Sequence, residues 1–177
     1  MSIPNDFDSI EYLKSGNQRQ QNAYRILTES ALFIKLQDYQ PILVGTIPIG
    51  IDIANSDLDI ICYWNDKTKF TSELKKYFNN EKGFQLRETE DAVIANFFLD
   101  NIEIEIFAQN APSKMQNAYR HMIIEYDLLV EKGEEFRKRI IELKKKGLKT
   151  EPAFAQLLGL EGDPYIELLK LEKQKDR

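Results

Sequence analysis

The spacing of apolar residues changes along the chain, and these changes predict the order of the structural elements. Between residues 42 and 107, apart from the stretch 71–78, most apolar residues alternate with polar ones or form short unbroken runs, which is typical of β-strands. Before and after this region they recur every three or four positions, which is typical of amphipathic helices. We therefore expect strands at 42–44, 57–63, 85–89, 93–99 and 102–107, and helices at 19–36, 71–78, 113–130 and 134–146, with further helices starting near Thr150 and at Pro164.

Two of these strands are expected to form a hairpin, because Asp100-Asn101 between two alternating runs is a favourable two-residue turn. Glu103 and Glu105 then share one face of the hairpin, since side chains on a strand alternate between faces. The other face is wholly apolar and consists of Val93, Ala95, Phe97, Leu99, Ile102, Ile104 and Ile106.

The helices are expected to pack through apolar stripes at helical spacing. The stripe of the first helix consists of Tyr24, Leu27, Ala31 and Ile34, and that of the helix after Pro112 consists of Met115, Ala118, Tyr119, Met122, Tyr126 and Leu129. Gly133 is expected to break the chain between two helices, and Gly147 to end the second.

This order of elements predicts an α+β fold, a small mixed sheet flanked by helices with a C-terminal helical part. We expect a single domain over residues 1–177. In it, residues 1–110 form an α/β core with the N-terminal helix, and residues 111–177 form the helical part.

Two aspartates stand at the start of the strand that follows the loop after Val44. Asp57 and Asp59 are two positions apart, so on a strand they point to the same face, about 6.5–7 Å apart. The apolar run Ile60-Ile61-Cys62 follows, which puts both carboxylates at the rim of a buried sheet. Such concentrated negative charge is costly to desolvate unless a cation neutralises it, and carboxylate oxygens are ligands that suit Mg²⁺.

The same stretch resembles a known signature. Val44-Gly45-Thr46, a gap of ten residues, and then Asp57-Leu58-Asp59-Ile60 resemble the signature of the polymerase-beta-type nucleotidyltransferase superfamily. The wider run 45–62, together with QNAYRHM at 116–122 and KTEPAFA at 149–155, is similar to a small bacterial family of unknown function within that superfamily.

The resemblance implies a nucleotidyltransferase-like fold and a metal-dependent reaction. A nucleoside monophosphate would pass from a nucleoside triphosphate (NTP) to an acceptor hydroxyl of a small molecule or a protein. Mg²⁺ (or Mn²⁺) ions held by Asp57, Asp59 and a third carboxylate would clamp the attacking and leaving oxygens. We assign the third carboxylate to Glu105 rather than Glu103, because Glu105 lies one pleat further from the turn, where solvation is poorer. The alternative is that both glutamates form a solvated strand face.

The loop between Gly45 and Ser56 is the candidate phosphate-binding segment. Gly45, Thr46 and Ser56 offer backbone N–H groups and hydroxyls, although ordinary turn chemistry would give the same residues. The superfamily usually has Gly or Ser where this chain has Thr46, and the loop contains no arginine. We therefore expect the cations for the triphosphate to come from the helices.

Two helical segments are candidates for contacts with the substrates. Arg120 with Gln116 is the first choice for binding the triphosphate or the acceptor, and the lysines between Lys144 and Lys149 are the second. The simpler interpretation of those lysines is that they complement a helix dipole in solvent. His121, the sole histidine, is equally compatible with a structural and a catalytic role.

Composition limits the possible partners and compartment. The chain has 24 Lys and Arg against 29 Asp and Glu, a formal net charge of −5, which disfavours binding of nucleic acid through a global field. Cys62 is the single cysteine, so no intrachain disulfide can form, and we expect a buried thiol in a reducing cytoplasm. We find neither a leader pattern nor an apolar run long enough for a membrane span, and we expect no membrane partner.

Two other functions stay open on the sequence. The chain could be an inactive relative that binds a nucleotide or a partner, as the arginine-free loop suggests. It could also be a metal-dependent phosphoesterase that uses the same carboxylates with water as the nucleophile. The products would separate these functions, but the sequence specifies neither the acceptor nor the NTP, nor the oligomeric state.

Overall fold

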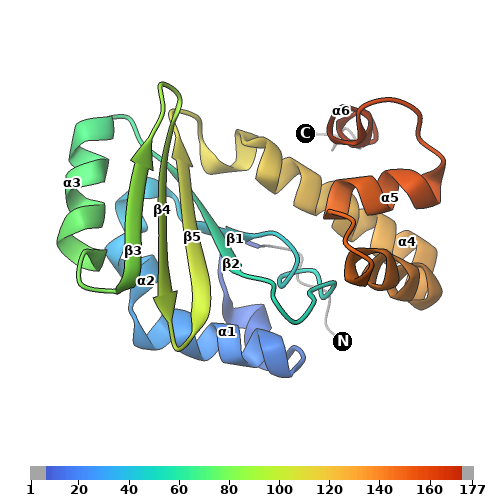
Figure 1. Cartoon of the computed structure of the whole chain (residues 1–177), viewed down its shortest axis with the longest axis horizontal. Coiled ribbons are helices and arrows are strands. Elements are labelled where there is room, and N and C mark those ends of the chain that lie inside the picture. The colour runs from blue at the N-terminus through green and yellow to red at the C-terminus, as the bar shows by residue number, and fades with distance from the viewer. Residues whose placement is uncertain (1–6, 173–177) are drawn as a thin grey trace.

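The computed structural model describes residues 7–172, and its centre is a five-stranded mixed sheet (Figure 1). The strands are β1 (Ile42–Val44), β2 (Leu58–Tyr63), β3 (Lys82–Glu88), β4 (Ala92–Leu99) and β5 (Ile102–Gln109), in the order β1-β2-β5-β4-β3. The β2–β5 pair is parallel and the other three pairs are antiparallel. The predicted α+β fold with a small mixed sheet is confirmed.

Helices cover both faces of the sheet. The helical elements are η1 (Glu11–Ser15), α1 (Gln18–Glu29), α2 (Leu32–Lys35), η2 (Gln37–Tyr39), α3 (Lys67–Phe78), η3 (Ser113–Met115), α4 (Asn117–Lys145), α5 (Thr150–Leu158) and α6 (Pro164–Leu169). In Figure 1 the C-terminal helices α4–α6 lie apart from α3, on the other side of the sheet. None of the helices in the described part of the chain is long and apolar enough to cross a membrane.

Two apolar clusters follow from this arrangement. The predicted apolar face of the hairpin is buried with α1, α2 and α3, and includes Val93, Ala95, Phe97, Ile104 and Ile106. The second cluster joins the opposite face of β1 and β2 to α4–α6, and includes Ile42, Val44, Ile61, Met122, Leu129 and Phe154. The predicted turn at Asp100-Asn101 is also confirmed, because both residues adopt positive φ angles, 47° and 61°, as a type I′ hairpin turn requires.

The prediction of one helix over residues 19–36 is wrong. Helix α1 ends at Glu29, and Ala31 takes a left-handed conformation with φ of 54° before the short α2 begins. This break rotates the later residues, so Leu32 and Leu36 are buried while Ile34, predicted to lie in the apolar stripe, is 68% exposed.

The start of the long C-terminal helix also differs from the prediction. Residues 113–115 form a 3₁₀ turn, and α4 begins only at Asn117. Met115, predicted to be buried, is therefore 69% exposed.

Two further boundaries lie earlier than the sequence predicted. Helix α3 begins at Lys67 rather than 71, because the Asp66 side chain caps it by accepting a hydrogen bond from the Lys69 amide at 2.9 Å. Strand β3 begins at Lys82 rather than 85, with an irregular register between Lys82 and Gln85.

The break at Gly133 is confirmed and sets the direction of the second half of α4. Gly133 has φ of 77° and ψ of −169°, whereas the flanking residues are helical. This region of backbone space is nearly restricted to glycine, because a Cβ atom clashes with the backbone there. The kink turns the segment after Gly133 so that Ile140 packs in the second apolar cluster.

We predict that Gly133→Ala lowers the free energy of unfolding by about 1–3 kcal/mol, because the backbone of an alanine is strained in this conformation. Urea unfolding measures the change. Arg139→Ala, an exposed helical position in the same element, is the control and should change stability by less than about 0.5 kcal/mol. Equal stability of the Gly133→Ala variant and the parent would contradict the assignment of strain to this residue.

Candidate active site

Gly45 lets the Asp59 carboxylate lie directly against the backbone where β1 ends. It has φ of 81°, and a Cβ atom built on it would stand 2.3 Å from Asp59 Oδ2. That distance is far inside van der Waals contact, so glycine is required here both by conformation and by space. The Gly45–Asp59 contact therefore joins the two halves of the sequence signature in space.

The loop from Thr46 to Ser56 is held from outside by side chains that donate to its carbonyl oxygens. From α1, Gln20 Nε2 donates to the carbonyl oxygens of Ile47 at 2.9 Å and Pro48 at 3.2 Å, and Arg19 Nη2 donates to that of Ser56 at 2.5 Å. From α4, Arg137 Nη1 donates to the carbonyl oxygens of Ile49 and Gly50, and Lys144 Nζ donates to that of Ile51 at 2.8 Å. The loop has no arginine of its own, and the cations around it fix its backbone instead.

The two predicted hydroxyls of the loop lie together. Thr46 Oγ1 donates to Ser56 Oγ at 3.3 Å, and Ser56 Oγ also accepts a hydrogen bond from the Ile53 amide at 3.0 Å. Gly45, Thr46 and Ser56 all line one cleft of about 860 Å³. The structure thus brings the three predicted phosphate-binding residues together at one side of this cleft.

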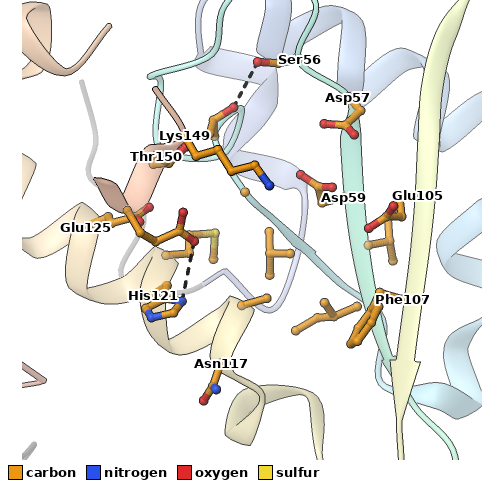
Figure 2. A pocket seen from close by; sticks show the side chains of 18 of the residues that line it. Ser56, Asp57, Asp59, Glu105, Phe107, Asn117, His121, Glu125, Lys149 and Thr150 are labelled. Carbon is orange, nitrogen blue, oxygen red and sulfur yellow. Dashed lines mark hydrogen bonds and ion pairs between the residues drawn. The ribbon is translucent and has the colours of Figure 1, made fainter. Parts of the chain in front are cut away.

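The three predicted carboxylates lie along the same cleft on neighbouring strands. Asp57 immediately precedes β2, Asp59 is the second residue of β2, and both line the cleft. Asp59 stands directly opposite Glu105 in the parallel β2–β5 register, where adjacent strands are about 4.8 Å apart. Figure 2 shows Asp57 and Asp59 along the same segment, Asp57 just before β2 and Asp59 within it, with Glu105 on the neighbouring strand.

The two glutamates of β5 have different surroundings. Glu105 lines the cleft and is partly buried, whereas Glu103 is exposed and is not among the described residues that line it. Asn96 on β4 contacts both, donating from Nδ2 to Glu103 Oε1 at 3.2 Å and to Glu105 Oε2 at 3.3 Å. This geometry agrees with the choice of Glu105, although the catalytic role itself stays a prediction.

The carboxylates repel one another. Burial raises the pKa of Asp59 to about 7, and the charges of Asp57 and Glu105 add to the rise, while Lys144 opposes it. Asp59 is thus a carboxyl group that needs a nearby cation in order to carry its charge easily at neutral pH.

Helices α4 and α5 form the opposite side of the cleft. Its lining residues from these helices and their flanks include Gln116, Asn117, His121, Glu125, Lys144, Lys149, Thr150 and Glu151. In Figure 2, His121 and Glu125 lie across the cleft from Asp59 and Glu105, and the Lys149 side chain extends from the start of α5 in the direction of Asp59.

Lys144 is buried in this wall rather than solvated. It is 6% exposed, and burial lowers its pKa, while the charges of Glu125, Asp52 and Glu151 raise it. The interpretation of Lys144 as a solvated partner of the helix dipole is therefore wrong for this residue. Lys149 lines the cleft as well, whereas Lys145 and Lys146 are exposed and are not among the described residues that line it. A substrate contact of Lys144 or Lys149 stays a prediction.

Glu125 is the most deeply buried acid of the wall. It is 3% exposed, and burial raises its pKa well above the usual value, with the charge of Glu151 adding to the rise and Lys144 opposing it. His121 lies nearby, with Nε2 at 2.8 Å from the Tyr165 carbonyl oxygen and Nδ1 at 3.8 Å from Glu151 Oε1. Because a carbonyl can only accept, His121 Nε2 carries the proton in that contact.

Arg120, the first-choice cation, is not among the described residues that line the cleft. Its guanidinium forms an ion pair with Glu172, with Nη2 at 2.7 Å from Oε2. Its neighbour in the prediction, Gln116, does line the cleft. The structure therefore separates the two residues, and a nucleotide-binding role for Arg120 stays a prediction without support from its position.

Sequence reasoning did not select Glu125, Glu151 or Lys144 individually as site residues. A signal for Glu125 was present, because it follows Met122 by three positions and precedes Leu129 by four, on the apolar stripe of α4. An acid on a buried stripe is a candidate for function. Lys144 was included only as a member of the lysine group, and Glu151 only as part of the 149–155 stretch that carries the resemblance.

The carboxylates fit a divalent cation by their chemistry and placement. They are oxygen donors in a partly buried cluster of like charge. Among the described residues, no group of three His, Cys, Asp or Glu side chains is arranged to hold an ion by itself. That is compatible with Mg²⁺, which is commonly bound by one or two carboxylates together with substrate phosphates and water.

Several solved structures of nucleotidyltransferases share this fold. The Cid1 poly(U) polymerase bound to MgATP has a TM-score of 0.58 at 10% identity, over 76% of this chain and 46% of that chain. A cytoplasmic RNA terminal U-transferase has a TM-score of 0.51 at 16% identity, over 72% and 38%. The GLD-2/RNP-8 complex has a TM-score of 0.53 at 14% identity, over 85% and 63%.

These similarities show the fold, and the present chain spans less than two thirds of each of those chains. Because the neighbours include enzymes named for RNA, the expectation that nucleic acid is not a partner stays a prediction.

None of the curated proteins matches the sequence. A family match covers residues 14–171, and therefore both the carboxylates on the sheet and the helical wall of the cleft. The chain belongs to the family described as "Domain of unknown function (DUF4269)".

Proposed function

We propose that this protein is a metal-dependent nucleotidyltransferase that moves a nucleoside monophosphate from an NTP to an acceptor hydroxyl of a small molecule or a protein. The observation that carries the proposal is the register of the sheet. Asp59 and Glu105 face each other on adjacent parallel strands, with Asp57 beside them and the Gly45 loop at the same cleft. Fold similarity adds to the proposal but does not establish activity.

Asp57, Asp59 and Glu105 would hold Mg²⁺ (or Mn²⁺). When bound, the metal would neutralise the charge of the phosphates and lower the pKa of the acceptor hydroxyl. The acceptor oxygen would form a bond to the α-phosphorus as the bond to the pyrophosphate breaks. Glu105, at its Oε atoms, would take the proton of the hydroxyl, and its hydrogen bond from Asn96 would keep the carboxylate oriented.

The triphosphate would lie against Gly45, Thr46 and Ser56. Lys149, which extends across the cleft, is the best placed cation for the β- and γ-phosphates (Figure 2). Lys144 would contribute its charge from within the wall, where Ile51 fixes its ammonium group. The positive charges of Lys144 and Lys149 would attract the triphosphate in place of an arginine, which the loop lacks.

We predict that Asp57→Asn and Asp59→Asn each lower the affinity for Mn²⁺ in the presence of ATP at least tenfold, because each removes a charged oxygen ligand. Isothermal titration calorimetry measures the affinity. Asp91→Asn, an exposed aspartate elsewhere, is the matched control and should bind like the parent. Unchanged Mn²⁺ affinity in both site variants would refute the metal site.

The products of an incubation with Mg²⁺, an α-labelled NTP and a mixture of small-molecule acceptors distinguish the candidate functions. Pyrophosphate together with a labelled acceptor supports the proposed function. Free nucleoside monophosphate without a labelled acceptor identifies a phosphoesterase, and binding without turnover identifies an inactive relative.

We predict that Glu105→Gln reduces metal-dependent turnover by at least a hundredfold, because it removes the proposed proton acceptor and metal ligand. Glu103→Gln is the matched control on the same face of β5 and should retain turnover within about threefold. Steady-state pyrophosphate release measures both, and urea unfolding checks that both variants fold. A greater loss in the Glu103 variant would reverse the assignment.

We predict that the metal-free protein becomes less stable as the pH rises from about 4 towards 7, and that Asp59→Asn reduces this loss. The pKa of Asp59 is raised from 3.8 to about 7, so the folded state binds the proton more tightly than the unfolded chain across this range. Urea unfolding with EDTA at pH 5 and pH 8 measures the difference, with Asp91→Asn as the control. The same pH dependence in the Asp59→Asn variant and the parent would contradict the shift.

A further inference from the structure

We propose that the α4–α5 wall of the cleft is the acceptor subsite and that the acceptor is an amino alcohol, carrying a protonated amine near the hydroxyl that reacts. The proposal rests on the function proposed above and names its substrate class. It stands on two buried oxygen atoms that lie in this wall and lack a partner among the described residues, Gln116 Oε1 and Glu125 Oε1.

Gln116 presents an acceptor that is fixed in orientation. The residue is 3% exposed, and its Nε2 donates to the carbonyl oxygens of Cys62 at 2.8 Å and Ala111 at 2.9 Å. Because both partners are carbonyls, the amide cannot turn over, and Oε1 must accept any further hydrogen bond. A buried acceptor without a partner costs free energy, which a donor group on a ligand would recover.

Glu125 presents the second acceptor and lies within α4, whereas Gln116 immediately precedes that helix. Its Oε1 has no hydrogen-bond partner within residues 7–172, although the residue lines the cleft. In Figure 2 the carboxyl group lies on the helical side, across from Asp59. Gln116 and Glu125 are nine positions apart, which is about 13 Å at helical rise, so a small ligand cannot bridge them. The amine is therefore assigned to Glu125, whose oxygen is part of a carboxyl group that can carry charge.

The charges around Glu125 favour a cation over a neutral group or a phosphate. Glu151 from α5 adds a second carboxylate, and Lys144 is the cation whose charge acts on both. The Lys144 ammonium is also committed to the Ile51 carbonyl. Lys149 extends away towards Asp59, on the side assigned to the triphosphate. An ammonium group at Glu125 would balance the remaining negative charge.

Binding of an ammonium group at Glu125 can be detected through the change in protonation of its carboxyl group. Burial and the charge of Glu151 raise the pKa of Glu125. The other groups that face this part of the wall are Lys144 and His121 from α4, and the Tyr165 carbonyl oxygen of α6 contacts His121. An ammonium ion that binds there would favour the charged carboxylate, so binding would release a proton to the buffer. A neutral polyol would not.

The test uses a matched pair of probes, 1,3-diaminopropan-2-ol and glycerol, which share a three-carbon skeleton and the central hydroxyl. We expect the diamine to bind the parent protein at least tenfold more tightly than glycerol at pH 7.5, with proton release seen as a buffer-dependent heat in calorimetry. Glu125→Gln should lower diamine affinity at least tenfold and abolish the proton release. Glu135→Gln, on an exposed turn of the same helix, should bind like the parent.

Glu151→Gln is the second variant and should weaken diamine binding without abolishing it, and urea unfolding verifies that both variants fold. Equal affinity for the two probes, or no binding of the diamine at 50 mM, would overturn the proposal. So would diamine binding that Glu125→Gln and Glu151→Gln both leave unchanged.

Failure of this inference can be distinguished from failure of the proposed function. The same variants are titrated with Mn²⁺ and ATP, which report on the carboxylates across the cleft. Loss of diamine selectivity with intact Mn²⁺-ATP binding refutes the amine subsite alone. Diamine binding that depends on Glu125 in a protein without Mn²⁺-ATP binding refutes the nucleotidyltransferase function and leaves the amine subsite standing.

Discussion

The contact between the Asp59 carboxylate and the Gly45 backbone is the constraint on which the site depends. A side chain of any size at position 45 would meet Asp59 Oδ2, so the loop can leave β1 only through a glycine. The same contact brings the carboxylate to the start of the loop, where the parallel β5 places Glu105 directly opposite. The contact between Gly45 and Asp59 therefore fixes the positions of the loop, the Asp59 carboxylate and the neighbouring strand β5 relative to one another. It also brings Asp59 close to Glu105, and this concentrated negative charge is poorly solvated by water alone.

The helical wall is tied to this centre by a buried ammonium group. Lys144 reaches the Ile51 carbonyl across 93 positions of sequence and lies within the electrostatic influence of Glu125, Glu151 and Asp59. Burial of ionic groups contributes little net stability, because desolvation offsets most of the attraction between them. An apolar pair of similar size would serve the fold at least as well. The presence of Lys144 and Glu125 in the wall is thus better explained by what the cleft binds than by stability.

The two sides of the cleft have different roles in the proposed reaction. The sheet side presents carboxylates and a backbone loop, which suit a metal-bound triphosphate, while the helical side presents buried acceptors, which suit donor groups of a second substrate. The solved nucleotidyltransferases share the sheet and its flanking helices at 10–16% identity, which is a likeness of fold. The side chains that line the helical side of the cleft come from α4, α5 and their flanks.

The sequence by itself determined the features that depend on local periodicity. Alternation placed the apolar residues of the β4–β5 hairpin on one face and Glu105 on the other, and the spacing of Gly45, Asp57 and Asp59 identified the signature. Helix boundaries at Ala31 and Asn117 escaped prediction, because a single left-handed residue or a 3₁₀ turn leaves no clear periodic signal. Only the tertiary structure decided which surfaces meet. It turned Arg120 towards Glu172 and buried Lys144 and Glu125 beside the cleft, because contacts between residues far apart in sequence, rather than helical period, set the solvation of a charged side chain.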